Sequence, residues 1–552
     1  MIGLVSATAA GRIAATRLAE AWPDGTRDYP VAALADAWRE CDALVCFLAT
    51  GATVRLVAPL LEDKHDDPAV VCVDERSRHA VALLGGHGAG ANALAARVAD
   101  VLGAEPVVTT ATDASGVPGL DTLGWPVEGA VAAVSRAMLD GSRVRLAADA
   151  TWPLPAFPPN VGGSGTHSVV VTERLVATDP TTVVLRPPAL VVGVGASRGV
   201  GVDEVDALVR TALEDAGFSP LSVCAVVTVD AKRDEWGIAG AAARNGWPVR
   251  TYSALRLASV EVPNPSDAAL AAVGTASVAE AAALVEGAEL VVQKRKSAMA
   301  TVAVARVRPR GRLALVGLGP GARDLLTPRA VAELRRASVV VGLDQYVAQV
   351  RDLFRPGTRV LESGLGSEEE RARAAVGEAA AGHAVALIGS GDAGVYAMAS
   401  PALDVAGDDI DVVVVPGVTA NLAASALLGA PLGHDHAVVS LSDLHTPWPV
   451  IERRTRAAAE ADLVVTFYNP RSRGRDWQLG KALAVLAEHR PPSTPLGVVR
   501  DASRPGERVE LTTLAELDVG RVDMSCVVVV GSSQTRLRAG RMVTPRGYRW
   551  LP

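Results

Sequence analysis

A glycine-rich loop in the middle of the chain, GLGPGA at 317–322, is the first feature whose spacing could bind a cofactor. Gly317, Gly319 and Ala322 fit the pattern G-x-G-x-x-G/A of dinucleotide-binding folds, and Asp344 lies about where a ribose-binding acid would stand. In those folds the helix begins inside the glycine motif, so that its first turn meets the pyrophosphate. The motif alone therefore allows an NAD(P)-dependent oxidoreductase, provided that a helix begins within the loop.

The residues that follow argue against such a helix. Pro320 interrupts the loop, and Thr327-Pro328 is a typical pair of N-cap and first helical residue. We therefore expect the glycine loop to end before the next helix begins, so that no helix N-terminus would face a pyrophosphate bound by the loop. A nicotinamide cofactor is the less favoured ligand.

Other loops that follow predicted strands offer glycine backbone and neutral hydroxyls. They include 390–396, 415–420 and 467–475, at strand ends of the kind where open α/β sheets bind ligands. They contain no Walker lysine and no phosphate cradle, which suits a cofactor with a sulfonium and a carboxylate better than a pyrophosphate. Asp392 stands between glycines directly after a buried strand, where we expect a carboxylate to have little structural use.

The elements that must position these loops follow from the hydrophobic pattern. Short β-branched runs alternate with alanine-rich amphipathic stretches almost from end to end, which predicts parallel sheets covered by helices. The fold class is α/β, and 552 residues are enough for three or four domains. The clearest predicted strands are Ala43–Phe47, Ala69–Asp74, Ala189–Val194, Ser222–Val229, Leu313–Gly319, Ser338–Gly342, Ala384–Ile388, Asp411–Val415, Leu463–Tyr468 and Cys526–Val530.

Composition excludes several classes of partner. A formal net charge of −7 and an aromatic content of 4% indicate neither a basic surface nor the stacking surfaces that would bind nucleic acid. The five cysteines form no CxxC pair, so we expect neither a metal site nor a disulfide framework. Neither a signal peptide nor an apolar run of about 18 residues is evident. We expect a cytoplasmic protein with a small-molecule ligand and no membrane partner.

Five ordered blocks connect the C-terminal part to a known family. They are VGLGPG (316–321), SGDAGVYAMASPALD (390–404), VPGVTANLAASALLGAPLGHDHAVVSLSDLHTPW (415–448), FYNPRSRGR (467–475) and TPRGY (544–548). The segment from Leu313 to Tyr548 resembles the tetrapyrrole methylases and, within them, the precorrin-3B C17-methyltransferases. The resemblance implies two α/β domains that bind S-adenosylmethionine and methylate a precorrin at C17, with ring contraction, in cobalamin biosynthesis. It also implies a homodimer.

The resemblance assigns roles to individual residues. Those assigned to the cofactor are Gly319, Pro320, Gly321, Gly391, Asp392, Ala393, Val395, Tyr396, Thr419, Ala420, Tyr468, Asn469, Thr544, Pro545 and Arg546. Ring contraction should need a proton donor and acceptor, for which the candidates are Asp392, His434, Asp435 and Asp443. Arg471, Arg473 and His445 are assigned to the substrate, since guanidinium groups pair well with carboxylate arms.

Plainer roles stay open for some of these residues. Gly391 could serve only a turn, Thr419 only a helix cap, and the arginines and the histidine loop only a solvated surface. Ala322 also departs from the family pattern, which often has an acid there, and GSSQTR at 531–536 lacks an expected asparagine after its glycine. We expect neither departure to disable the site.

Five N-terminal stretches, at 47–61, 83–113, 191–205, 229–238 and 261–284, resemble the CbiG family, whose members act on a lactone-bearing cobalt-precorrin. Opening a lactone requires an activated water or a nucleophile. The residue types that could supply one are His87, Asn92, Glu204, Lys232 and Glu235. Because Ala89, Ala196 and Ser197 replace the residues usual in that family, a non-catalytic module that holds a labile tetrapyrrole stays an alternative.

The leading hypothesis is a two-module protein of corrin-ring synthesis: a CbiG-like module fused to a precorrin-3B C17-methyltransferase. The main boundary is placed at the basic, proline-interrupted stretch 306–312. The predicted domains are 1–125, 126–187, 188–307 and 312–552. The alternatives are a cobalt-precorrin-3 methylase with an active cobalt-precorrin-5A lactone hydrolase, an NAD(P)-dependent oxidoreductase, and a non-enzymatic tetrapyrrole carrier.

Overall fold

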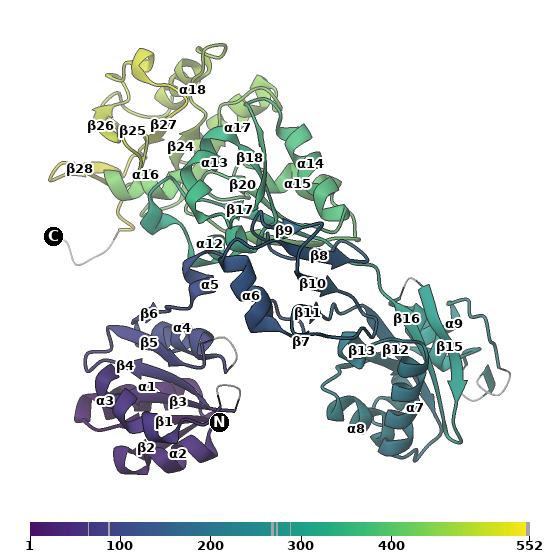
Figure 1. Ribbon diagram of the computed structural model, residues 1–552. Helices are drawn as coiled ribbons and strands as arrows, with labels where there is room; N and C mark the ends of the chain where they lie inside the picture. Colours follow the sequence, from purple (N-terminus) through teal and green to yellow (C-terminus); the bar gives the residue numbers. More distant parts are fainter. Residues whose placement is uncertain (64–65, 87–88, 267–269, 272–273, 288, 548–552) are drawn as a thin grey trace. The chain divides into compact units, whose positions relative to one another are not determined.

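The computed structural model in Figure 1 describes residues 1–63, 66–86, 89–266, 270–271, 274–287 and 289–547. The chain forms two compact units. The first comprises Met1–Thr151, Phe157–Pro309 and Arg355–Gly357, and the second comprises Trp152–Ala156, Arg310–Phe354 and Thr358–Pro552.

The first sheet of the first unit has the strand order β2-β1-β3-β4-β5-β6. Every residue of its central strand β4 is buried, as expected for an apolar run covered on both faces. Its strands are β1 (Ile2–Ser6), β2 (Thr26–Pro30), β3 (Ala43–Phe47), β4 (Ala69–Val73), β5 (His79–Leu84) and β6 (Glu105–Val107), and its helices are α1 (Ala9–Ala21), α2 (Leu34–Glu40), α3 (Thr50–Val57) and α4 (Ala91–Leu102), followed by the short α5 (Ala111–Ala114).

Two further sheets complete the first unit, in the orders β7-β11-β10-β8-β9 and β14-β13-β12-β16-β15. The strands of the former are β7 (Val127–Gly129), β8 (Val144–Ala148), β9 (Val161–Gly162), β10 (His167–Val171) and β11 (Thr182–Leu185), with helix α6 (Val131–Leu139). The strands of the latter are β12 (Leu190–Ala196), β13 (Val223–Val229), β14 (Val249–Tyr252), β15 (Glu289–Lys296) and β16 (Ala300–Arg306), with helices α7 (Val202–Asp215), α8 (Trp236–Arg244), α9 (Ala254–Ala258) and α11 (Val278–Leu284).

The second unit begins with a sheet of order β19-β18-β20-β17-β21, in which every pair of neighbours is parallel. Its strands are β17 (Arg312–Gly317), β18 (Val339–Leu343), β19 (Arg359–Ser363), β20 (Ala384–Gly389) and β21 (Asp411–Val415), and its helices are α12 (Pro328–Arg336), α13 (Asp344–Val350), α14 (Glu368–Ala380) and α15 (Ala399–Val405). Thr327 caps α12 as predicted, because its hydroxyl accepts a hydrogen bond from the amide of Ala330 at 3.2 Å.

A second domain of this unit holds the sheet β23-β24-β27-β25-β26 and the small sheet β22-β29-β28. The strands are β22 (Gly429–Ala430), β23 (His436–Ser440), β24 (Val464–Tyr468), β25 (Pro495–Arg500), β26 (Arg508–Thr513), β27 (Cys526–Val530), β28 (Arg536–Arg538) and β29 (Arg541–Val543). The helices are α16 (Ala420–Leu428), α17 (Trp448–Glu460) and α18 (Gln478–Ala487).

The predicted multidomain α/β class is confirmed, but five of the six sheets in the described residues contain at least one antiparallel pair, contrary to the expectation of parallel sheets. Antiparallel pairs include β4 with β5, β15 with β16, and β25 with both β26 and β27. A hydrophobic stretch of sequence indicates that a strand is buried, but it does not indicate whether the strand is parallel or antiparallel to its neighbours. The connections 74–78 and 297–299 are also too short for a parallel crossover.

Candidate active site

Three loops meet at the carboxyl end of the parallel sheet, after β17, β20 and β21. The amide of Gly319 donates to the carbonyl of Gly391 at 3.0 Å, and the amide of Gly391 donates back to Gly319 at 2.8 Å. A Cβ atom on Gly417 would lie 2.2 Å from the carbonyl oxygen of Gly391, and one on Gly317 would lie 2.7 Å from the same oxygen. Glycine is therefore required because three backbones touch.

Asp392 ties two of these loops together. One carboxylate oxygen accepts from the amide of Gly394 at 2.8 Å, and the other accepts from the amide of Gly417 at 3.0 Å. The expectation that this carboxylate has little structural use was therefore wrong. It joins the loop after β20 to the loop after β21, a contact that chain spacing could not reveal.

The hydroxyl of Tyr468, at the end of β24, organises the first turn of α16. It lies 2.5 Å from the hydroxyl of Thr419 and accepts from the amide of Asn421 at 2.6 Å. Thr419 immediately precedes α16, yet its side chain caps no amide of the helix. The amide oxygen of Asn421 in turn accepts from the buried hydroxyl of Thr466 at 2.8 Å. Burial raises the pKa of Tyr468 above its ordinary value, so the group stays a neutral hydroxyl near pH 7.

Two predicted cofactor residues have left-handed backbones. Tyr396 has a φ of 51° and Asn469 a φ of 50°; this conformation is rare for a bulky side chain such as tyrosine, whereas asparagine adopts it more often. The hydroxyl of Tyr396 donates to the carbonyl of Val438 at 3.0 Å, and its ring centroid lies 5.5 Å from that of Tyr468. The side-chain amide of Asn469 donates to the hydroxyl of Ser440 at 3.0 Å. The two domains of the second unit thus share one polar cluster.

The loops after the adjacent parallel strands β23 and β24 bring Asp443 into this neighbourhood. Gln478, the first residue of α18, donates to the Asp443 carboxylate at 2.9 Å. Arg475 donates to the carbonyls of Leu441, at 3.2 Å, and of Asn469. Burial lowers the pKa of Arg475 from its ordinary value, although Asp443 opposes the shift, and the guanidinium remains charged.

Comparison with known proteins places this arrangement in a family. Residues 312–518 match the Tetrapyrrole (Corrin/Porphyrin) Methylases. A probable cobalt-factor III C(17)-methyltransferase of Salmonella typhimurium is 48% identical over 239 residues, which are 43% of this chain and 99% of that relative. The chain belongs to the tetrapyrrole methylases. Its C-terminal part is a methyltransferase unit, as the sequence blocks predicted.

A second curated relative agrees with this assignment, and a solved structure is also similar to the chain. A precorrin-3B C(17)-methyltransferase of a Sinorhizobium species is 40% identical over 249 residues, 43% of this chain and 97% of that protein. The crystal structure of the methyltransferase CobJ is 36% identical and covers 42% of this chain and 98% of its own, with a TM-score of 0.40. Residues 32–113 and 190–305 match Cobalamin synthesis G N-terminal and Cobalamin synthesis G C-terminus, which confirms the CbiG-like module.

The methylase unit does not bring all of the predicted residues together. His434 and Asp435 are exposed and precede β23, whereas Asp443 follows it. The two ends of this strand are about 13 Å apart, because each residue of a strand adds about 3.3 Å. The amide of Asp435 bonds to the ring of His434 at 2.7 Å. This loop therefore lies at the opposite end of β23 from Asp443, and its role in proton transfer stays a prediction.

The remaining predicted residues of the methylase unit have mixed surroundings. Thr544 is buried, and its hydroxyl lies 2.8 Å from that of Thr535, while Pro545 and Arg546 follow it. Arg471 donates to the carbonyl of Val519 at 3.1 Å. Arg473 and His445 are exposed, and Ala393 and Pro320 are buried.

One residue of the site was missed by sequence reasoning. Arg504, in the loop between β25 and β26, donates to the carbonyl of Pro320 at 2.6 Å and to the hydroxyl of Ser390 at 2.7 Å. A Cβ atom on Gly321 would lie 2.5 Å from the side chain of Arg504. Arg504 lies outside the five sequence blocks, so only its position in a loop after a strand could have drawn attention to it.

The predicted residues of the CbiG-like module that the structure describes lie in helices or loops that belong to two different sheets. Asn92 is in α4 and donates to Thr110 at 3.0 Å, and His87 lies outside the described residues. Lys232 and Glu235, after β13, form an ion pair of 3.0 Å. A catalytic role for Asn92, Lys232 and Glu235 stays a prediction.

Two features are absent from the part of the chain that the structure describes. No helix there is long and apolar enough to cross a membrane. No group of three or more His, Cys, Asp or Glu side chains there is placed to hold a metal ion.

Proposed function

We propose that the methylase unit transfers a methyl group from S-adenosylmethionine to C17 of a precorrin in cobalamin biosynthesis, with metal-free precorrin-3B as the substrate. The observation that carries the proposal is the cluster at the carboxyl ends of β17, β20 and β24. There, the interlocked glycine loops lie near Asp392 and the Tyr468 hydroxyl. The chain that carries this cluster belongs to a family of methylases.

The donor set fits this cofactor better than a dinucleotide. The glycine loop at 317–322 is followed by a short turn and then by α12 from Pro328, so no helix begins within the loop to meet a pyrophosphate. The site instead offers loop backbone and the hydroxyls of Thr419 and Tyr468. S-adenosylmethionine supplies an electrophilic methyl group when bound. The residues that would hold it are Gly319, Pro320, Gly321, Gly391, Asp392, Ala393, Val395, Tyr396, Thr419, Ala420, Tyr468, Asn469, Thr544, Pro545 and Arg546.

The chain's own residues mainly position the reactants. Methyl transfer is an in-line displacement that needs contact and exclusion of water rather than a strong nucleophile. Asp392 and Tyr468 hold their loops in register. Among the predicted acid–base groups, Asp443 is the one favoured for proton transfer, since Gln478 fixes its carboxylate and Arg475 links its loop to the backbone of Asn469.

A second substrate has support of its own. The Salmonella relative named for cobalt-factor III is 48% identical, against 40% for the relative named for precorrin-3B. A cobalt-containing substrate would also agree with the presence of the CbiG-like module. Turnover assays with the metal-free and the cobalt-loaded substrate, run side by side on the full chain, distinguish the two.

The first test is calorimetric titration of S-adenosylhomocysteine and, separately, NADH into the full chain. We expect micromolar binding of the former and none of the latter. Binding of NADH alone would overturn the methylase proposal and favour the oxidoreductase. We also propose a homodimer through the methylase unit, which light scattering at micromolar concentration tests directly.

A further inference from the structure

The loop between β25 and β26, residues 501–507, has a constrained backbone. Ser503 has a φ of 61°, a left-handed conformation that is uncommon for residues other than glycine, asparagine and aspartate. Its amide donates to the carboxylate of Glu507 at 2.7 Å, and the amide of Arg504 donates to the carbonyl of Asp501 at 2.9 Å. Backbone of this kind persists only where its surroundings fix it, and it is frequent at functional sites. These contacts fix the point from which the Arg504 side chain starts.

The Arg504 side chain reaches from the second domain of the methylase unit to two loops of the first. Its Nε donates to the carbonyl of Pro320 at 2.6 Å, and its Nη2 donates to the hydroxyl of Ser390 at 2.7 Å. Pro320 lies in the loop after β17, and Ser390 lies directly after β20. One guanidinium therefore connects the loops of two neighbouring parallel strands.

These two contacts flank a pair of glycines whose backbones bond to each other. Gly319 and Gly391 exchange hydrogen bonds of 3.0 and 2.8 Å, and the two acceptors of Arg504 are their immediate neighbours in the chain. The stem of Arg504 also lies against Gly321, where a Cβ atom would come within 2.5 Å of its Cγ. All three glycines are predicted cofactor residues. Arg504 thus fixes backbone at the proposed cofactor site.

The contacts of Arg504 depend on the shape of its guanidinium more than on its charge. Both acceptors are neutral, and Arg504 forms no ion pair with another residue that the structure describes. A guanidinium presents its N–H donors in a rigid planar fork, so two of them can meet two acceptors at once. A lysine ammonium at this position would keep the charge but would lack the fork that spans both acceptors.

We propose that Arg504 is a positioning residue for the cofactor: it presets the loops after β17 and β20 in the arrangement that binds S-adenosylmethionine. This role rests on the proposed function of the methylase unit. Without the two contacts the loops lose their fixed arrangement, and ligand binding has to restore it. The loss therefore appears in the affinity for the cofactor, because Arg504 acts through the loops and not on the reacting atoms.

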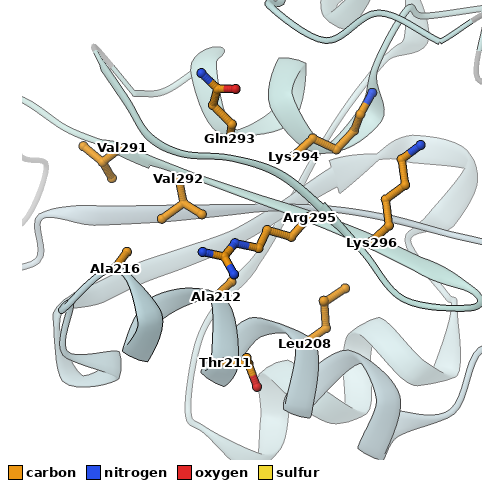
Figure 2. Close-up of a pocket in the computed structure, with 10 residues that line it drawn as sticks. All are labelled: Leu208, Thr211, Ala212, Ala216, Val291, Val292, Gln293, Lys294, Arg295 and Lys296. Atoms are coloured by element: carbon orange, nitrogen blue, oxygen red, sulfur yellow. The ribbon is translucent and has the colours of Figure 1, made fainter.

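Calorimetric titration of S-adenosylhomocysteine into the full chain tests this role. Arg504→Gln should weaken binding about tenfold, because two hydrogen bonds from a charged donor are lost, and Arg504→Lys should weaken it about threefold, because only one can be kept. The matched control is Arg295→Gln in the CbiG-like module. Arg295 pairs with Asp215 at 2.7 Å, and Figure 2 shows it directed toward Ala212 of α7. This control should leave the affinity unchanged.

Two readouts separate positioning from a purely structural role. In turnover, Arg504→Gln should raise the KM for S-adenosylmethionine about tenfold and leave kcat within about twofold. A residue that only stabilised the fold would lower the free energy of unfolding and leave the KM of the folded protein unchanged. Ser390→Ala should weaken binding by itself but add nothing to Arg504→Gln, because the same contact is already absent.

Failure of this role and failure of the proposed function give different results. If S-adenosylhomocysteine does not bind the unchanged chain, the proposed function is overturned together with the role of Arg504. If the unchanged chain and Arg504→Gln bind it equally well, only the role of Arg504 is overturned. Full affinity in Arg504→Lys, or additive losses in the double variant with Ser390→Ala, would also overturn it, because neither is compatible with a two-point contact.

Discussion

Three polar side chains of the candidate active site hold backbone from other parts of the chain. Tyr468 holds the first turn of α16, Asp392 holds the loop after β21, and Arg504 holds the first glycine loop. A side chain that organises backbone affects both cofactor affinity and stability when it is changed. The two effects must therefore be measured together.

Replacement of Tyr468 by phenylalanine removes only the hydroxyl that joins Thr419 to Asn421. Loss of these hydrogen bonds should cost about 1 kcal/mol and weaken S-adenosylhomocysteine binding roughly tenfold. Calorimetric titration measures the affinity. Tyr252→Phe, which removes a hydroxyl bonded to Glu286 in the other unit, is the control and should leave the affinity unchanged.

Replacement of Asp392 by asparagine keeps the shape of the side chain but turns one acceptor into a donor. The new NH₂ group must then face the amide of Gly394 or of Gly417. We expect a loss of roughly 1–3 kcal/mol in the free energy of unfolding. A fall in the turnover rate beyond the fall in affinity would show that Asp392 also acts in the chemistry. Unchanged stability would contradict the bridging role.

At the scale of the elements, the candidate active site is formed where the ends of neighbouring strands bring their loops together. Parallel strands β17, β20 and β21 deliver three glycine loops to one edge, and their backbones are in contact. Side-chain variation cannot relieve crowding of this kind, since backbone atoms have nowhere to move. The loops should therefore be far less tolerant of substitution than the helices that cover the sheet.

Gly417→Ala tests this contact. The added Cβ would lie 2.2 Å from the Gly391 carbonyl, so we expect destabilisation of about 3 kcal/mol or more and loss of S-adenosylhomocysteine binding. Gly480→Ala in α18 is the matched control, because nothing lies within 4 Å of its Cβ position. It should stabilise the protein by about 0.5–1 kcal/mol. Chemical denaturation checks both, and equal effects would contradict the argument.

The start of α12 offers a prediction confined to one helix. Thr327→Ala removes the hydroxyl that accepts from the amide of Ala330. The expected cost is about 1 kcal/mol, whereas Thr327→Ser should cost little, because serine caps as well. Denaturant titration monitored by circular dichroism measures the difference.

For the whole molecule, acid stability should depend on carboxylates that hold backbone in the CbiG-like module. The Ser297 hydroxyl and the Met299 amide hold the pKa of Glu204 below its ordinary value of about 4.3. A lowered pKa in the folded state stabilises the protein above that ordinary value. The contribution is lost as the pH falls through the folded pKa.

The melting temperature should therefore fall as the pH is lowered from about 5 toward 3, and Glu204→Gln should show a smaller fall. Glu214→Gln is the control, because Glu214 lies on the same helix, is exposed, and forms no ion pair with another described residue. Scanning calorimetry over this pH range measures the transition assigned to the first unit. Identical profiles for Glu204→Gln and the unchanged protein would contradict the prediction.

The sequence by itself determined the α/β class, the ten strand positions to within about two residues, the cap of α12 and the family, because each rests on local pattern or ordered motifs. The domain boundaries and the roles of individual site residues stay predictions. Only the tertiary structure decided strand direction, the contact among Gly317, Gly391 and Gly417, and the separation of His434 from Asp443. The bridging role of Asp392 and the contact of Arg504 with the glycine loop were also decided there. These features join residues far apart in the chain, and hydrophobic periodicity carries no information about such pairs.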